Sequence, residues 1–467
     1  MRPSMDSENQ LRALIGRRSA AVAVAAIAAP ALLAYNLSPS STFLNQALAL
    51  VGWGAWVAVL APGVQGGRGR LNPVQIALAL LGVAALASMA CAGLPGSLAL
   101  SSIGMLAAAV LVLWTGEAAQ RSGAGQLAFS ALAWGLLLTG LLSTVLALIQ
   151  YFLPTWPDGV WLAANATPGR SAGNLRQPNH LSSLLLWSIV ALVGLAEVRA
   201  WSERRVAALM ACLVVGVALT ASRTGGLGLL LLAAWGALDK GLRPAQRRAL
   251  LAAPVLFSLC WWGLGEWAQW QHKAYIGDDQ LHKSDLSSSR FGIWANAWSL
   301  VHAHPWTGVG WGEFNFAWSL TPFPGRPVAF FDHTHNIVLQ LAVELGLPLA
   351  ALVLGLLGWG LWLGFARARA AQGVAGVLQR AAWLMVLMMV LHSQLEYPLW
   401  YAYFLLPTAF AWGLCLGEAP LPDEVPPLRP TAAPRAFTPL AIAGFALALG
   451  GFLAVRDYQR VVAVYTV

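Results

Sequence analysis

In the stretch Phe331-Asp332-His333-Thr334-His335-Asn336-Ile337, a long polar segment ends and an apolar run begins that continues to about residue 365. A run of this length is typical of a helix that crosses the hydrocarbon core of a membrane. Two imidazoles, a carboxylate and a carboxamide therefore stand at the edge of a predicted membrane helix. Ionisable groups are costly at that position, so they commonly mark a functional site.

The whole chain has the composition of an integral membrane protein. Of its 467 residues, 58% are hydrophobic and only 10% are charged, whereas about a quarter of the residues in a soluble domain are charged. The net charge of +9 comes from Lys and Arg scattered over short loops, without a basic patch interleaved with aromatic residues. This pattern argues against nucleic acid as a partner and favours membrane topology and anionic membrane lipids as its cause.

Neither the cysteines nor the N-terminus indicates another class of protein. The four cysteines lie in or beside apolar runs, without CxxC spacing or a nearby His: Cys91, Cys212, Cys260 and Cys415. We predict that they are small core residues and form neither a disulfide nor a metal site. The basic segment that ends at Arg18 precedes an apolar run without a convincing cleavage site, which predicts a signal anchor.

Apolar runs recur along the chain and predict an all-α polytopic membrane protein with about 12–13 transmembrane helices. The runs lie near residues 19–35, 43–62, 74–92, 97–117, 127–153, 180–197, 205–221, 225–239, 246–264, 336–365, 376–395, 399–417 and 438–455. Ser222-Arg223-Thr224-Gly225-Gly226 separates two short runs. It predicts a turn, because an Arg is costly inside a membrane helix and Gly-Gly follows it.

The basic residues fall in alternate loops, which the positive-inside rule places in the cytoplasm. These residues are Arg17, Arg18, Arg68, Arg70, Arg121, Arg199, Arg204, Arg205, Lys240, Arg243, Arg247, Arg248, Arg367, Arg369 and Arg380. Arg456 and Arg460 do not fit the alternation. The sequence thus predicts N-terminal transmembrane helices (1–264) with an outward loop at 154–179, one large outward loop (265–335), and C-terminal transmembrane helices (336–467).

Four arginines lie on the predicted outer face: Arg170, Arg176, Arg223 and Arg290. A guanidinium group is permanently charged, and its planar fork of donors matches phosphate oxygens. Several of them together would hold a pyrophosphate. The alternative is that each arginine extends to lipid phosphates on its own. Arg223 favours the first interpretation, because it interrupts an apolar stretch.

His335 is the candidate general base, since an imidazole beside a carboxylate suits proton transfer near neutral pH. The alternative is that His335 and Asn336 only cap the next helix. A metal site formed by Asp332, His333 and His335 lacks further evident ligands, so we expect neither a metal nor a cofactor. Two carboxylates, Glu344 and Glu396, can orient a His, bind sugar hydroxyls or pair with an Arg, and the sequence leaves these alternatives open.

Four motifs resemble the superfamily of O-antigen ligases, O-antigen polymerases and bacterial protein O-oligosaccharyltransferases. His335-Asn336, followed after nine residues by Gly346-Leu347-Pro348, resembles its signature. Ser222-Arg223 and Ser289-Arg290-Phe291 resemble its arginine positions, and Trp306-Thr307-Gly308-Val309-Gly310 resembles its Gly-rich approach to the histidine.

The resemblance implies a GT-C-type glycosyltransferase that needs no metal and acts at the periplasmic face of the bacterial inner membrane. Its donor would be a glycan on undecaprenyl pyrophosphate, and the closest reading is an O-antigen ligase with a lipid A–core sugar as acceptor. His335 would deprotonate the acceptor hydroxyl, and the arginines would stabilise the departing pyrophosphate. A single displacement with one base would invert the configuration of the anomeric carbon. The expected supporting or substrate-binding residues are Asn336, His333, Asp332, Gln177, Asn179 and Glu396.

Three alternatives remain open. Arg176-Gln177-Pro178-Asn179-His180-Leu181 and Leu395-Glu396-Tyr397-Pro398-Leu399-Trp400-Tyr401 resemble the branch that modifies proteins such as pilins. The lack of a sizeable domain after the last apolar run favours the ligase branch instead, and an O-antigen polymerase would use the same donor. A flippase for the lipid-linked glycan is the alternative of another class, but the two halves show no matching broken helices.

Overall fold

The computed structural model describes residues 5–64, 71–165, 169–272, 285–324, 326–327, 331–418 and 438–465. Within these residues all regular secondary structure is helical, which confirms the predicted all-α class. Nine of the described helices are long and apolar enough to cross a membrane, so the protein is a multi-pass membrane protein. Arg68, Arg70 and the part of the large loop at 273–284 lie outside the described residues.

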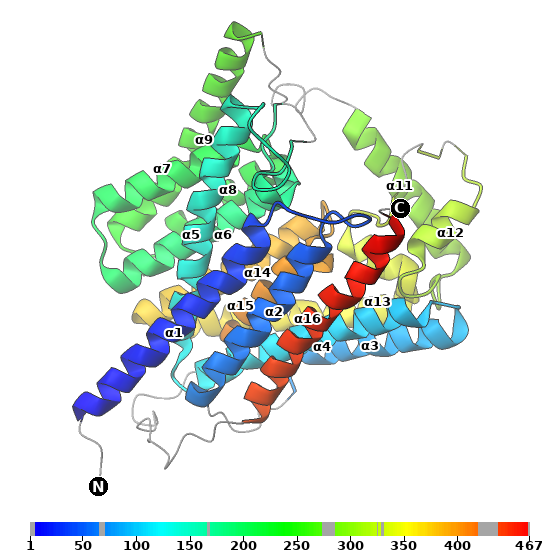
Figure 1. Ribbon diagram of the computed structural model, residues 1–467, viewed down its shortest axis with the longest axis horizontal. Coiled ribbons are helices and arrows are strands. Elements are labelled where there is room, and N and C mark those ends of the chain that lie inside the picture. Colours follow the sequence, from blue (N-terminus) through cyan, green and yellow to red (C-terminus); the bar gives the residue numbers. More distant parts are fainter. Residues whose placement is uncertain are drawn as a thin grey trace.

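Every predicted apolar run coincides with a helix in Figure 1. The helices before the large loop are α1 (Met5–Leu32), α2 (Phe43–Leu60), α3 (Pro73–Cys91), α4 (Gly96–Arg121), α5 (Gly125–Phe152), α6 (Pro178–Arg199), α7 (Glu203–Leu219), α8 (Arg223–Leu238) and α9 (Pro244–Trp270). Those that follow are α11 (Asp285–Ala303), α12 (Phe314–Leu320), α13 (Ile337–Ala370), α14 (Gly373–Ser393), α15 (Ala402–Leu416) and α16 (Pro439–Tyr465).

Several helices begin where the sequence supplies a cap. Asn72 and Gln75 form a reciprocal capping box at α3. Ser222 accepts a hydrogen bond from the backbone N–H of Gly225 at 3.1 Å and caps α8, so the predicted turn before Arg223 is present. The predicted loop from residue 265 begins later than expected, because α9 continues to Trp270.

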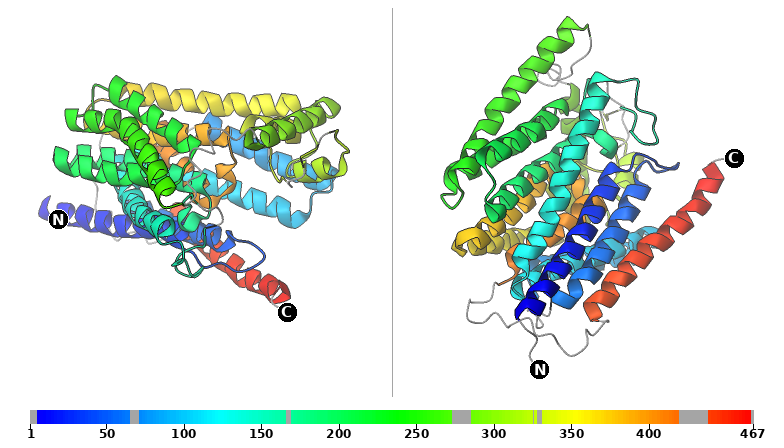
Figure 2. Two further views of the ribbon diagram at one scale, coloured as in Figure 1. Left: turned by 90° about the horizontal axis from the view of Figure 1, so that it is seen from above. Right: turned by 60° about the vertical axis from the view of Figure 1, so that its left-hand side comes forward.

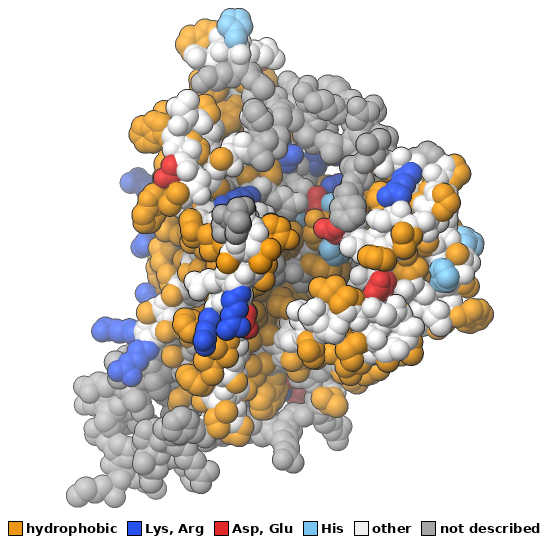
Figure 3. All heavy atoms as spheres, turned by 45° about the vertical axis from the view of Figure 1, so that its right-hand side comes forward, with side chains coloured by type: hydrophobic (Ala, Val, Ile, Leu, Met, Phe, Trp, Pro, Cys, Tyr) orange, Lys and Arg blue, Asp and Glu red, His pale blue; other side chains and the backbone are white. Residues whose placement is uncertain are grey.

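Helix α6 is the central helix of the bundle. In its apolar window 94% of the residues are buried, against 17% for α9 and for α16. It packs against α5, α7, α8 and α14, while α16 packs on α2 at the outside, as Figures 1 and 2 show. Hydrophobic side chains predominate on the face shown in Figure 3, where charged ones are sparse. An apolar exterior of this kind is suited to contact with lipid.

Ion pairs connect the loops that carry the predicted cytoplasmic charges. Arg243 after α8 pairs with Glu197 in α6 at 3.3 Å. Arg380 in α14 pairs with Asp239 at 2.6 Å. Loops from the α6–α7, α8–α9 and α13–α14 connections therefore lie together at one end of the bundle, as their shared charge predicted.

A second core holds the end of the large loop against α3 and α13. Its buried residues include Leu81 of α3, Ile293 of α11, Trp318 of α12 and Val343 of α13. Because α11 and α12 pack on the outer half of α13, these two helices of the large loop are a structured part of the protein next to the segment 331–336.

Candidate active site

The segments predicted to face outward meet at one end of the bundle. Arg176, which precedes α6, donates hydrogen bonds to carbonyl oxygens at Ala34 and Ser41, between α1 and α2. The turn at 394–401, between α14 and α15, contacts the start of α6 and the start of α11 through Glu396. The structure thus brings together loops that are far apart in the sequence.

Glu396 is the centre of this end. Its side chain is only 6% exposed. One carboxylate oxygen, Oε1, accepts hydrogen bonds from Arg290 Nη2 at 2.8 Å and from Asn179 Nδ2 at 3.1 Å. The other, Oε2, lies 2.8 Å from His335 Nδ1. A single carboxylate therefore joins α6, α11 and the segment before α13. We call these four residues the Glu396 cluster.

The carboxylate of Glu396 is charged at neutral pH. Burial by itself raises the pKa of this group, but the hydrogen bond and charge of His335, with the charge of Arg290, outweigh burial and lower the pKa to about 2. These partners replace the water that burial removes. The Glu396 carboxylate thus stays negatively charged next to the imidazole.

The backbone around His335 is held in one geometry. His335 has a left-handed conformation with φ of 56°. The next residue, Asn336, caps α13 by accepting a hydrogen bond from the N–H of Leu339 at 3.0 Å, and its Nδ2 donates to the carbonyl of Gln394 at 3.2 Å. Asn336 is therefore the helix cap, whereas the His335 side chain turns to Glu396.

This geometry selects the tautomer that a general base requires. When Nδ1–H of His335 donates to the Glu396 carboxylate, Nε2 carries the free lone pair. The His335 side chain is 18% exposed, so part of the ring is open to a reactant. Tyr397 packs edge-on against this ring at 5.0 Å between centroids and holds it in place.

His333 packs among aromatic rings. It stacks on Tyr397 at 4.3 Å and meets Trp400 edge-on at 4.8 Å. Burial, followed by the charge of His335, lowers the pKa of His333 to about 4, so its ring is neutral at physiological pH. Asp332 beside it is exposed. The two histidines of the motif thus occupy different environments, and only His335 joins the cluster.

Two further arginines lie at the α7–α8 turn. Ser222 donates to Asn179 Oδ1 at 2.7 Å, so the residue before Arg223 is tied to the Glu396 cluster. Arg223 itself is exposed at the start of α8. Arg170 donates from Nε to the carbonyl of Thr220 at 3.0 Å. Arg170, Arg223 and Arg290 therefore reach the same end of the bundle from three different segments.

Arg176 is placed differently from the other predicted arginines. Its φ is 60°, and its guanidinium group donates to the carbonyl oxygens of Ser41, at 2.9 Å, and Ala34. The side chain is thereby committed to the α1–α2 segment, and the structure does not bring it to Glu396. Gln177 lies just before α6 in an extended conformation, and its side chain does not cap that helix.

The Gly-rich segment Trp306–Gly312 is fixed to a break in α13. Gly346 has φ of 74° and interrupts that helix. The carbonyl groups left free accept N–H groups from the loop: Val309 donates to Val343 at 2.9 Å and Gly310 to Glu344 at 3.0 Å. A Cβ at Gly346 would lie 2.5 Å from the carbonyl carbon of Trp306, so close approach requires glycine there.

An apolar groove of about 300 Å³ lies between α3, α4, α13 and α15, and it includes the first residue of α13. Ile337 and Trp400 are among its lining residues. Ile337 follows Asn336 directly, and Trp400 touches the ring of His333. The groove therefore places an apolar surface next to the charged residues.

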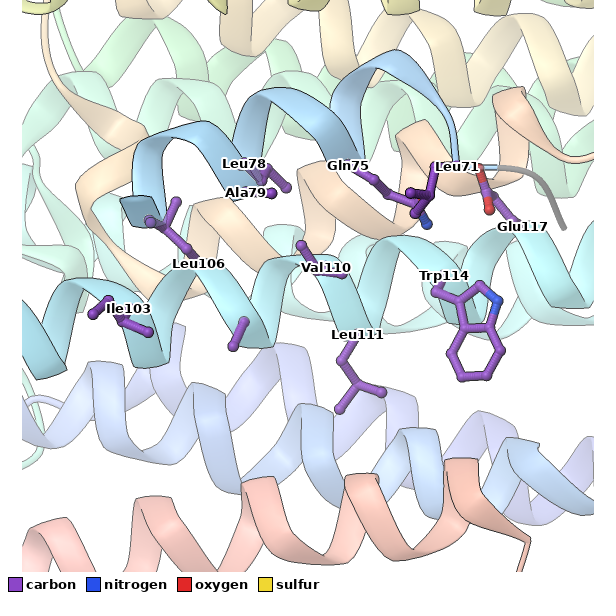
Figure 4. A pocket seen from close by; sticks show the side chains of 12 residues that line it. Leu71, Gln75, Leu78, Ala79, Ile103, Leu106, Val110, Leu111, Trp114 and Glu117 are labelled. Carbon is purple, nitrogen blue, oxygen red and sulfur yellow. The ribbon is translucent and has the colours of Figure 1, made fainter. Parts of the chain in front are cut away.

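A second apolar pocket of about 650 Å³ lies on α3 and α4 and shares Leu78 and Leu106 with this groove. Figure 4 shows its lining side chains, with Leu106 toward one end and Trp114 and Glu117 toward the other. The two hollows together give α3 and α4 a long apolar surface.

The described part of the chain contains no group of three or more His, Cys, Asp or Glu side chains suited to a metal ion. The residues that the structure brings together, Arg290, Glu396, His335 and Asn179, are donors, a carboxylate and an imidazole. Such a set can bind an anion and transfer a proton.

The sequence left three alternative roles open for Glu396, and it indicated no role for Tyr397 or Ser222. Glu396-Tyr397-Pro398 was visible as a polar motif in an outward turn, and this was the available signal. Ser222 precedes Arg223, and its own hydroxyl group donates to Asn179 Oδ1. These three contacts depend on tertiary packing, which periodicity and spacing do not report.

The fold and the site together define a multi-pass, all-helical membrane protein with an Arg–Glu–His cluster beside an apolar groove. Comparison with protein families matches residues 208–354 to the O-antigen ligase family. Residues 380–467 match the C-terminal part of a virulence factor membrane-bound polymerase family, and residues 172–195 match a protein glycosylation ligase family.

Two curated relatives come from Acinetobacter baylyi. A general O-oligosaccharyltransferase is 28% identical over 333 residues, which cover 68% of this chain and 56% of the relative. A ComP-specific O-oligosaccharyltransferase is 26% identical over 268 residues, which cover 54% of this chain and 45% of the relative. The chain thus spans about half the length of these relatives. These matches support a place for the chain in the superfamily of O-antigen ligases and oligosaccharyltransferases.

Proposed function

We propose that the protein is a metal-independent glycosyltransferase that moves a glycan from undecaprenyl pyrophosphate to a hydroxyl group of an acceptor protein. The observation that carries the proposal is the Glu396 cluster, in which a buried, charged carboxylate holds both His335 and Arg290 at 2.8 Å. A base and an anion-binding group are thereby fixed next to each other. The matches to the superfamily support this class of reaction.

In the proposed reaction, Nε2 of His335 takes the proton of the acceptor hydroxyl as its oxygen attacks the anomeric carbon. The bond from that carbon to the pyrophosphate oxygen breaks, and the leaving group departs with the electron pair. Glu396 stabilises the imidazolium formed on His335. Arg290 and Arg223, with Arg170 beside the α7–α8 turn, stabilise the charge on the pyrophosphate. A single displacement inverts the anomeric configuration.

The apolar groove supports a lipid-linked donor. It reaches from Leu78 and Leu106 to Ile337 and Trp400, next to the cluster. A polyprenyl chain is entirely apolar and has no hydrogen-bonding groups to satisfy, so such a groove suits it. The pyrophosphate would then lie at Arg290 and Arg223, with the active site on the periplasmic side of the inner membrane.

The acceptor is the point on which two candidate functions differ. A protein acceptor, such as a pilin-like protein, is favoured by both O-oligosaccharyltransferase relatives and by the protein glycosylation ligase match at 172–195, which contains Asn179 of the cluster. The sequence prediction of a lipid A–core acceptor is the second candidate, and the O-antigen ligase match at 208–354 favours it. Both use the same donor chemistry.

The test is glycan transfer by the purified full chain from an undecaprenyl-pyrophosphate glycan in liposomes, with EDTA present. A Ser-containing pilin peptide and lipid A–core are offered in parallel, and His335→Ala is the control. Product on the peptide supports the proposal, and product on lipid A–core alone supports the ligase. Longer donor chains with neither acceptor used indicate a polymerase. Donor that is bound but never transferred overturns both candidates in favour of a flippase.

A further inference from the structure

A third pocket lies at the opposite end of the bundle from the Glu396 cluster. It has a volume of about 720 Å³ and lies between α8, α13 and α14, near the loops that carry the predicted cytoplasmic charges. Both α8 and α14 pack on α6, and the pocket fills the space between their basic ends.

The walls of this pocket are apolar. Its lining includes Leu231, Leu238, Phe365, Trp383, Leu384 and Leu387. Leu238 is 81% exposed, so this side of the pocket opens to the outer surface of the bundle. The lining residues of α14 between Arg380 and Leu387 span about 10 Å along the helix axis. The pocket can therefore hold the first part of an acyl chain.

One end of the pocket is positively charged. Arg380 donates from Nε to Asp239 at 2.6 Å and from Nη1 to the carbonyl oxygens of Ala368 and Ala371. Arg369 also lines the pocket and is exposed, and it forms no hydrogen bond or ion pair with any described residue. Lys240, exposed between the lining residues Asp239 and Gly241, adds a third cation. Three cations against one carboxylate leave this rim with a charge of +2.

We propose that this pocket binds an anionic glycerophospholipid of the cytoplasmic leaflet, with the phosphate at Arg369 and Lys240 and an acyl chain against α8 and α14. A lipid fits this pocket because the apolar walls continue directly from the charged rim, whereas a free phosphate would use the rim alone. Basic pockets between transmembrane helices on the cytoplasmic side are suited to anionic headgroups. Lipid binding at this pocket does not require the proposed glycosyl transfer.

Such a lipid would stabilise the packing of α8 against α13 and α14. At this end the Arg380–Asp239 pair connects the end of α8 to α14. A lipid between them would fill a space that side chains leave open and would neutralise the excess charge. We therefore expect bound anionic lipid to raise the thermal stability of the protein.

The experiment is native mass spectrometry of the full chain in detergent, titrated with phosphatidylglycerol or with phosphatidylcholine of the same acyl chains. We expect the first phosphatidylglycerol to bind at least about fivefold more tightly, and Arg369→Gln to remove most of this preference. Arg204→Gln is the matched control, since Arg204 is also exposed among the basic loops but does not line the pocket. Ala234→Trp places a large side chain on the α8 wall and should weaken the first binding step for both lipids.

Equal affinity for the two lipids would overturn the proposal, and so would equal effects of Arg369→Gln and Arg204→Gln. Competition by millimolar inorganic phosphate would indicate that the rim binds a free anion and would also overturn it. A thermal-shift measurement with the same lipids is the second readout. Stabilisation by phosphatidylglycerol that is lost in Arg369→Gln supports the assignment, provided that the unliganded variant melts at the wild-type temperature.

Discussion

Replacing Glu396 by Gln tests the centre of the proposed site. Gln keeps the shape of the side chain but removes the charge that holds His335 and Arg290. With roughly 4 Å between the charge centres and an effective dielectric constant of about 20, the carboxylate stabilises a full imidazolium by about 4 kcal/mol. If about half of the proton has moved in the transition state, the loss is about 2 kcal/mol, or roughly thirtyfold in rate.

The assay is glycan transfer in liposomes at saturating donor, with kcat measured at neutral pH. Glu396→Asp keeps the charge and should recover part of the rate. Glu418→Gln is the matched control, because Glu418 also pairs with an arginine, at 2.7 Å from Arg367, but its side chain is 78% exposed. We expect no change in kcat there. A kcat for Glu396→Gln within threefold of the wild type, in a protein of unchanged melting temperature, would refute the role of Glu396.

Four further predictions concern other parts of the site. His333→Phe should keep the stack on Tyr397 and retain most of the activity, whereas His335→Phe should abolish transfer in the same liposome assay. Gly346→Ala should lower the free energy of unfolding by roughly 1–3 kcal/mol, because the residue has a positive φ and its Cβ would meet the backbone of Trp306. Gly358→Ala in the same helix is the control and should not lower it, because a Cβ there meets nothing within 4 Å. Arg223→Ala should weaken donor binding without changing the melting temperature. Arg176→Ala should lower the melting temperature without weakening donor binding, because Arg176 bonds to the α1–α2 segment. Weaker donor binding in Arg176→Ala, with a lower melting temperature in Arg223→Ala, would exchange their roles. Because the pKa of Glu396 is lowered to about 2, its contribution to stability is full above about pH 4.5 and is lost as the pH falls toward 2, so the wild type should lose more stability than Glu396→Gln between pH 5 and 3.

The helices could be predicted from the sequence because the membrane makes hydrophobic length a direct signal. The turn before Arg223 was predictable for the same reason, since a charge and two glycines interrupt an apolar stretch. The grouping of loops also followed from charge: the pairs Arg243–Glu197 and Arg380–Asp239 connect loops that the positive-inside rule places on one side. In these cases the residue type alone indicates the environment: apolar runs lie in the membrane, and basic residues lie in the loops of one side.

The partners of individual side chains could not be predicted in this way. Arg176 and Arg290 are both arginines in outward segments, but one binds backbone carbonyl groups and the other binds Glu396. The difference depends on which loop lies opposite each of them, and that is determined by tertiary packing. His333 and His335 show the same limit, because alternate residues of one short segment point to different neighbours.

The break in α13 at Gly346 determines how the site can move. Since the free carbonyl groups of α13 are bound by the loop at 305–310, that loop and the first part of α13 form one rigid body, and His335 stands at its edge. We therefore expect opening of the site to leave residues 305–310 and 337–346 fixed relative to each other. The proposed proton acceptor, His335, is then expected to keep its position relative to this loop during the entry of each substrate.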